Sequence, residues 1–264
     1  MAVRQIEVRT LGELVDRLTP DVDRRTGRRR DAGVYRGAAD ADQPLLTALD
    51  RLGGIDPPHT KVSLEQHLLR SFSRYSRPYL GGPAASDWEL LIAAQHHGVP
   101  TRLLDWTYSP LVAAHFATLP CATRNGHVAV WRLDWQRVHE SFGFPPLALT
   151  LRDLESFGDG DGPLTAFAIV EGRVERPFAC MLEPPSLDAR IVAQAATFTL
   201  CSDISRAFDR FLAEHGLSDA LVQFVVPRDA VAYVRDQLDL VNVDERRLFP
   251  DLDGAAASIR RYYA

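Results

Sequence analysis

The sequence predicts an α+β fold, a single mixed domain in which a central mixed or split sheet is flanked by helices. Hydrophobic residues make up 46% and charged residues 25% of the 264 residues, as in ordinary globular chains. Helical and strand patterns are interspersed without strict βαβ alternation. The chain shows no internal repeat and no long linker. We therefore expect one domain over 1–264, with an N-terminal helix and basic loop in 1–30 and a core in 31–264.

Composition also limits the compartment and the class of partner. The segment Met1–Glu7 lacks the apolar core of a secretion signal, and no stretch reaches the roughly 18 to 20 apolar residues of a membrane span. We therefore expect a cytoplasmic protein with no membrane partner. Three separated cysteines, Cys121, Cys180 and Cys201, indicate buried thiols rather than a disulfide framework or a zinc knuckle. The net charge of −5 argues against broad nucleic-acid binding.

Local patterns define the first elements. Apolar residues recur at helical spacing over 11–18, and Pro20 ends this helix. The arginine-rich run 24–30 predicts a solvated loop, with contact to phosphate as the alternative. Residues 33–36 then predict a short strand that ends at Gly37.

Two capping boxes predict the next helices. Ser63 and Gln66 form the first, so a helix is expected to open at Ser63. Ser86 and Glu89 form the second, and the apolar stripe that follows is stopped by Gly98. Each box satisfies main-chain N–H groups that a helix leaves unpaired at its start.

A strand over 101–106 leads directly into another helix. Ser109 is its expected N-cap and Pro110 its first helical residue. Beyond it the expected strands are 127–133, 178–182, 190–200 and 220–226, the expected helices are 204–216, 228–238 and 254–262, and 140–171 is expected to be rich in loops.

Polar side chains concentrate at the junctions between these elements. Arg36 ends a strand before a glycine, where its guanidinium can reach a pyrophosphate. A tight helix-to-strand turn holds Gln95, His96, His97 and Arg102. Adjacent histidines on a helix point about 100° apart and cannot bind one metal ion from the same face. We therefore expect no metal site.

A second junction lies where a strand meets the following helix. It holds Asp105, Thr107 and Ser109, and main-chain N–H groups at such a helix start favour an anion. The structural alternative is that Asp105 pairs with Arg36 or Arg102. Thr107 and Ser109 would then only cap the helix.

Taken together, these motifs resemble the FRG domain family, which is named after a Phe/Tyr-Arg-Gly tripeptide. Here the tripeptide is Tyr35-Arg36-Gly37, and the thirteen-residue run from Gln95 to Thr107 is the most specific match. Further matches lie at 109–111, 115–117, 190–199 and 248–254. The resemblance covers about residues 30 to 260.

The motif order is in turn similar to that of ADP-ribosyltransferases, which implies an ADP-ribosyltransferase-like fold with NAD as co-substrate and no metal. The catalytic residues that this similarity implies are Arg36, Thr107, Asp105 and Gln194. The residues that it places around the cofactor are Tyr35, Gly37, Gln95, His96, His97, Arg102 and Ser109. ADP-ribosyltransferases have three such motifs, and the third, which Gln194 matches here, usually carries Glu. The amide of Gln194 cannot act as a base. Asp105 or Glu183 is therefore the alternative source of a carboxylate.

Three functions follow as hypotheses. The first is an NAD-consuming enzyme, an ADP-ribosyltransferase or NAD glycohydrolase with a protein or nucleic-acid acceptor, acting as a bacterial toxin or anti-phage effector. The second is a non-catalytic module that binds a nucleotide or a partner through the same cleft. The third is a nucleic-acid binder that acts through Arg24–Arg30.

Overall fold

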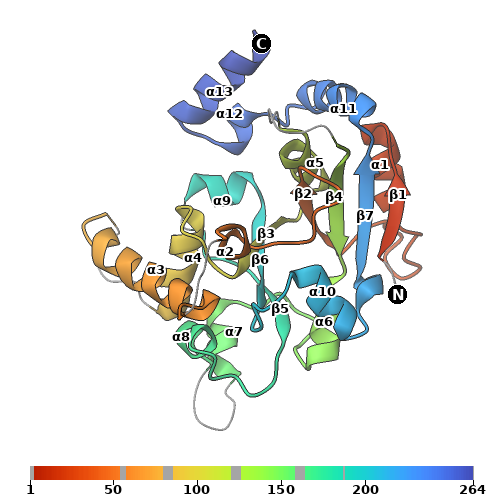
Figure 1. The fold of residues 1–264 in the computed structure, drawn as a ribbon. Helices are drawn as coiled ribbons and strands as arrows, with labels where there is room; N and C mark the ends of the chain where they lie inside the picture. The colour runs from red at the N-terminus through yellow and green to blue at the C-terminus, as the bar shows by residue number, and fades with distance from the viewer. Residues whose placement is uncertain are drawn as a thin grey trace.

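The computed structural model describes residues 3–53, 58–79, 86–119, 126–157, 164–186 and 188–263. In these residues seven strands form one mixed sheet in the order β1-β7-β4-β2-β3-β6-β5 (Figure 1). The strands are β1 (Arg4–Glu7), β2 (Val34–Ala38), β3 (Leu103–Thr107), β4 (Val128–Leu133), β5 (Ala179–Leu182), β6 (Ala196–Cys201) and β7 (Leu221–Val226). β1 and β7 are parallel, and all other adjacent strands in this order are antiparallel. The prediction of a mixed fold with one central sheet is confirmed.

The sheet is split between β2 and β3. These strands pair only at Tyr35 and Thr107. In contrast, β2 pairs with β4 from Val34 to Ala38, and β3 pairs with β6 over its whole length. The positions of β2 that follow Tyr35 therefore have no partner on β3, and the two strands part at this point.

Helices cover both faces of the sheet. The helices that pack on one face of β7, β4 and β2 are α1 (Leu11–Leu18), α5 (Pro110–Thr118) and α11 (Arg228–Leu240). The opposite face carries α6 (Trp135–Phe142) and α10 (Phe208–Glu214). A further apolar cluster beside β5 and β6 takes in α3 (Lys61–Ser76), α4 (Asp87–His96), α7 (Leu151–Ser156) and α8 (Ala166–Val170). The remaining short elements are α2 (Ala48–Arg51), α9 (Ala189–Ala193), the 3-10 helix Ser218–Ala220, α12 (Glu245–Leu248) and α13 (Leu252–Tyr262).

Gly37 lets α5 lie directly against β2. A Cβ atom at this position would come within 2.5 Å of the main-chain nitrogen of Ala117 and closer still to the carbonyl oxygen of Ala113. Both atoms belong to helix backbone, which cannot turn away as a flexible side chain can. The glycine of the tripeptide is therefore required by the packing of a helix on a strand.

Three sequence predictions about elements are corrected. The helix expected from Ser63 begins at Lys61, because Thr60 is the N-cap and Ser63 completes its capping box. The strand expected over 190–200 is α9 followed by β6. The segment 140–171 contains α7 and α8, which the capping residues Thr150 and Thr165 start. Residues 158–162, also predicted as loop, lie outside the described residues.

Cysteines and apolar helices bear on the expected compartment. Cys180 and Cys201 are buried free thiols, as predicted, whereas Cys121 lies outside the described residues. In the described part of the chain no helix is both long enough and apolar enough to cross a membrane. The arginine-rich run 24–30 is exposed throughout.

Candidate functional site

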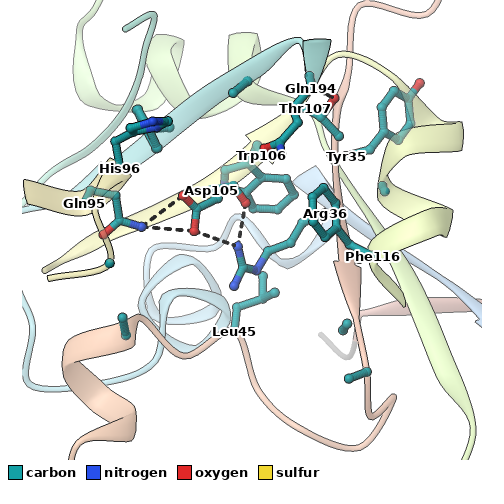
Figure 2. A pocket seen from close by; sticks show the side chains of 18 of the residues that line it. Tyr35, Arg36, Leu45, Gln95, His96, Asp105, Trp106, Thr107, Phe116 and Gln194 are labelled. Carbon is teal, nitrogen blue, oxygen red and sulfur yellow. Dashed lines mark hydrogen bonds and ion pairs between the residues drawn. The ribbon is translucent and has the colours of Figure 1, made fainter. Parts of the chain in front are cut away.

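A pocket of about 1060 Å³ opens where β2 and β3 part. Its wall comes from these two strands, the end of α4, the segment before and within α2, and α9. Figure 2 shows the side chains of Arg36, Asp105 and Gln95 directed toward one another in it. The predicted site residues that line it are Tyr35, Arg36, Gly37, Gln95, His96, His97, Asp105, Thr107 and Gln194.

Arg36 bridges the gap in the sheet. Its Nη1 donates a hydrogen bond of 2.6 Å to the carbonyl oxygen of Asp105 and lies 3.7 Å from that residue's Oδ2. Burial lowers the pKa of Arg36, Asp105 opposes this shift, and the nearby charge of Arg51 adds to it. A guanidinium nevertheless remains cationic at neutral pH. Arg36 and Arg51 therefore both place positive charge in the lining of the pocket.

Asp105 presents an accessible carboxylate to the same pocket, with 59% of its side chain exposed. Nε2 of Gln95 donates to both carboxylate oxygens at 3.0 Å. Oε1 of Gln95 accepts a hydrogen bond of 2.6 Å from the hydroxyl of Thr101, which is itself buried. This chain of hydrogen bonds fixes the amide and thereby orients the carboxylate. Asp105 thus contacts Arg36, one of its two predicted partners.

His96 forms an acid–base pair with Asp188, a residue that sequence reasoning missed. Nε2 of His96 lies 2.5 Å from Oδ2 of Asp188, and both residues line the pocket. The carboxylate also caps α9 by accepting from the main-chain nitrogen of Ile191 at 3.0 Å. Burial raises the pKa of Asp188, but the hydrogen bonds from Ile191 and His96 outweigh it and leave the pKa lowered. Asp188 is therefore an anion that orients the imidazole.

Thr107 and Gln194 lie in the pocket wall but are engaged in structural hydrogen bonds. The Thr107 hydroxyl donates to the carbonyl oxygen of Gln194 at 2.7 Å and accepts from the main-chain nitrogen of Ser109 at 3.0 Å. Nε2 of Gln194 donates to the carbonyl oxygen of Leu248 at 3.0 Å. These bonds join β3, α9 and the end of α12. Ser109 caps α5, as predicted, but is not part of the pocket lining.

Gln194 was expected to lie in a strand over 190–200, but it does not. It is the C-cap of α9, and the following Ala195 has a φ of 45°, in the left-handed region. Non-glycine residues in this region carry strain and cluster at functional sites. The tight turn brings the chain from α9 into β6 beside the pocket.

Three other predicted residues take up structural positions. Arg102 is buried, pairs with the equally buried Glu65 at 2.6 Å, and does not line the pocket. The hydroxyl of Tyr35 donates to Asp31, which also pairs with Arg132, so its polar end is satisfied by protein. Glu183, the alternative carboxylate, accepts from the hydroxyl of Tyr108 and is likewise not part of the lining.

Several lining residues were not predicted from the sequence. They are Asp40, Arg51, Asp188, Arg190 and Asp251. Asp188 carried a signal, because an Asp before a short apolar run is a helix N-cap. The guanidinium of Arg190 lies 4.8 Å from the ring centre of Phe249. In the described residues no group of three or more His, Cys, Asp or Glu is placed to hold a metal ion.

The fold and the pocket thus define a mixed α/β protein with a polar cavity in the split of its sheet. Residues 31–125 match the family model of the FRG domain. The predicted resemblance to the FRG domain is confirmed over this segment, which supplies β2, α4, β3 and α5. Comparisons with curated proteins and with solved structures found no match.

Proposed function

We propose that the pocket binds NAD and cleaves its nicotinamide–ribose bond, as an ADP-ribosyltransferase or an NAD glycohydrolase. One observation carries the proposal: an accessible carboxylate and a partly buried guanidinium, Asp105 and Arg36, approach within 3.7 Å in one pocket. The volume of about 1060 Å³ lies just above the roughly 300–1,000 Å³ typical of ligand sites. A dinucleotide is a ligand of the size that such a pocket accepts.

The charges of the pocket suit the charges of NAD. The pyrophosphate is anionic and matches Arg36 and Arg51, because guanidinium groups bind phosphate oxygens in a fork geometry. The nicotinamide ring is cationic, and its departure leaves positive charge on the ribose. A fixed carboxylate such as Asp105 stabilises charge that develops in this way. Gln95 supports this role by holding the carboxylate in place before the substrate arrives.

The bond-breaking step balances with the residues present. The C–N bond breaks toward nicotinamide, which leaves as a neutral molecule and needs no acid. Water or a nucleophilic acceptor then adds to the ribose carbon and loses a proton. His96, oriented by Asp188, is the group we propose to accept that proton. Gln194 would position substrate or protein rather than act as a base.

The proposed cleavage of NAD also suggests a cellular role. We propose a bacterial toxin or anti-phage effector, because NAD depletion or ADP-ribosylation harms the cell in which it occurs. The cytoplasm is the compartment we propose, and the free thiols of Cys180 and Cys201 fit a reducing environment. Induced expression of the wild type and of Asp105→Asn in bacteria tests this role, since growth arrest by the wild type alone is expected.

A second candidate function is a module that binds a nucleotide without turnover. It is favoured by the hydrogen bonds that occupy Thr107 and Gln194, two residues expected to contact substrate. Purified protein incubated with NAD distinguishes the two functions. Nicotinamide release that is lost in Arg36→Ala supports the enzyme. Calorimetric binding of NAD without any release, again lost in Arg36→Ala, supports the module. If the protein neither releases nicotinamide nor binds NAD, both candidate functions are contradicted.

A further inference from the structure

The solvent face of α3 carries a line of basic residues. This helix turns its buried residues, Glu65, Leu69 and Ser76, toward the body of the protein. The opposite face presents the exposed side chains of His67, Arg70, Arg74 and the C-cap residue Arg77. Residues three and four apart share one face of an α-helix, so these four form one continuous stripe.

No acidic side chain balances this stripe from within α3. The single carboxylate of the helix, Glu65, is fully buried and neutralised by Arg102. Among the described residues, Arg70 and Arg77 have no ion-pair partner. Arg74 donates a hydrogen bond to the hydroxyl of Tyr75. A cationic surface therefore stands on a chain whose net charge is −5.

Two exposed tyrosines lie at the end of the same helix. The side chains of Tyr75 and Tyr79 are 65% and 88% exposed. The guanidinium of Arg74 lies 4.4 Å from the ring centre of Tyr75 and holds that ring in place. Exposed aromatic rings beside cations are the arrangement on which unpaired bases stack.

We propose that this surface, defined by Arg70, Arg74, Arg77, Tyr75 and Tyr79, binds single-stranded nucleic acid. From Arg70 to Arg77 the helix rises by about 10 Å, at about 1.5 Å per residue. Phosphates repeat about every 3.4 Å along each strand of a stacked duplex and lie farther apart in an extended single strand, so that length reaches more than one phosphate. An acidic protein segment would use the arginines alone, whereas nucleic acid also uses the tyrosine rings.

The surface is not part of the pocket. Phe72, on the inner face of α3, contacts His97 of the pocket wall, with 6.3 Å between ring centres. The basic stripe lies on the opposite, solvent face of the same helix. Binding at α3 needs no NAD, so this inference goes beyond the proposed function and can be tested without it.

The chain offers a matched control for charge. The loop 24–30 holds exposed arginines, and in Figure 1 it lies on the side of the molecule opposite α3. The variant Arg24→Gln/Arg28→Gln/Arg30→Gln removes three positive charges, as does Arg70→Gln/Arg74→Gln/Arg77→Gln. Binding of a labelled oligodeoxythymidylate of about 12 nucleotides is measured by fluorescence anisotropy over a range of salt concentrations.

We expect the wild type and the loop variant to bind alike. The α3 variant should bind about tenfold more weakly or worse, and the slope of log affinity against log salt should fall by about 2, at about 0.7 per phosphate contact. Tyr79→Ala should weaken binding about fivefold with an unchanged slope. Equal binding by the α3 variant, loss of binding in the loop variant, or no binding by the wild type overturns the proposal. A Tyr79→Ala variant that binds like the wild type overturns the assignment to nucleic acid.

Discussion

Nη1 of Arg36 donates a hydrogen bond of 2.6 Å to the carbonyl oxygen of Asp105, across the gap at which β2 and β3 part. A side chain thus takes the place of a main-chain donor at the split. The bond leaves the guanidinium 17% exposed in the wall of the pocket. Arg36 therefore links β2 directly to Asp105 of β3.

Lysine at position 36 should weaken NAD binding. Arg36→Lys keeps the positive charge but loses the planar fork that reaches a carbonyl oxygen and a phosphate together. We expect the affinity for NAD, measured by calorimetry, to fall about tenfold. Arg17→Lys, on the exposed side of α1, is the control and should leave the affinity unchanged. An unaltered affinity in Arg36→Lys would show that the guanidinium does not contact the ligand.

Alanine at position 37 should destabilise the fold. The added methyl group would press on the backbone of α5, and overpacking of this kind costs about 3 kcal/mol. Urea unfolding followed by circular dichroism measures the loss. Gly126→Ala is the control, because a Cβ there meets no atom of the described residues within 4 Å, and it should change stability by no more than about 0.5 kcal/mol. Equal stabilities of the two variants would contradict this packing.

Loss of Arg102 should strongly destabilise the fold, although Arg102 does not line the pocket. Arg102→Leu leaves the carboxylate of Glu65 buried without a cation, which costs about 3–5 kcal/mol. The exposed pair of Arg206 and Glu214 provides the comparison, since Arg206→Gln should cost about 1 kcal/mol or less. If the double variant Glu65→Leu/Arg102→Leu is no more stable than Arg102→Leu, the unpaired carboxylate is not the cause.

The sequence predicted the local signals of the fold better than its long-range pairings. Capping residues predicted α4 and α5, because Ser86 and Ser109 act on their own helix starts, and apolar spacing together with Pro20 predicted α1. The boundary between α9 and β6 was missed because Ala195 adopts a left-handed conformation without being glycine. Such a turn depends on tertiary contacts that no local pattern encodes.

In the candidate site, too, local positions were predicted and long-range pairings were missed. Arg36, Gln95 and Asp105 stood at element ends and do line the pocket. Arg102 stood in the same motif, yet it faces the core because Glu65, thirty-seven positions earlier, supplies its partner. Asp188 joins His96 from ninety-two positions away. Neither pairing has a signature in the spacing of residues.

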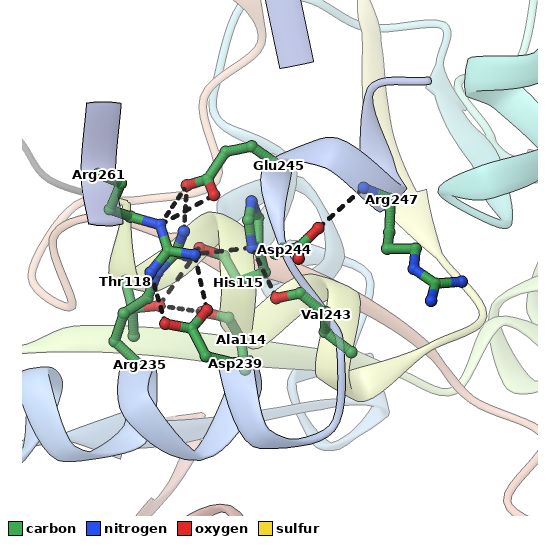
Figure 3. Close-up of polar contacts among 10 residues, drawn as sticks. All are labelled: Ala114, His115, Thr118, Arg235, Asp239, Val243, Asp244, Glu245, Arg247 and Arg261. Atoms are coloured by element: carbon green, nitrogen blue, oxygen red, sulfur yellow. Dashed lines mark hydrogen bonds and ion pairs between the residues drawn. The ribbon is translucent and has the colours of Figure 1, made fainter. Parts of the chain in front are cut away.

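A buried polar cluster fixes the C-terminal helices and should respond to pH. Figure 3 shows His115 of α5 beside Arg235, which bonds to Glu245, and Arg261 joining Glu245 to Asp239. Nδ1 of His115 lies 3.1 Å from Nη1 of Arg235 and 3.3 Å from the carbonyl oxygen of Val243. Nε2 of His115 has no partner in the described structure.

Burial, together with the charge of Arg235, lowers the pKa of His115 from 6.5 to about 4. The folded protein therefore binds fewer protons than the unfolded chain between these pH values, and stability falls as pH drops from about 6.5 to about 4. The full effect is about 3 kcal/mol.

Chemical denaturation at several pH values measures this dependence. The variant His115→Asn removes the titrating group and keeps a polar side chain. As the pH drops from about 6.5 to about 4, the free energy of unfolding of this variant should decrease less steeply than that of the wild type, with slopes that differ by up to about 1.4 kcal/mol per pH unit. Identical slopes in the two proteins would mean that His115 does not titrate as described.

The central claim is that the carboxylate of Asp105 stabilises the transition state of NAD cleavage. Asp105→Asn keeps the size and one of the two hydrogen bonds from Gln95 but removes the charge, and Asp16→Asn makes the same change on the exposed side of α1. Nicotinamide release by purified protein is the direct measurement. We expect Asp105→Asn to lower the rate constant about 100-fold with NAD affinity retained, and Asp16→Asn to match the wild type. Release by Asp105→Asn at the wild-type rate would contradict the account.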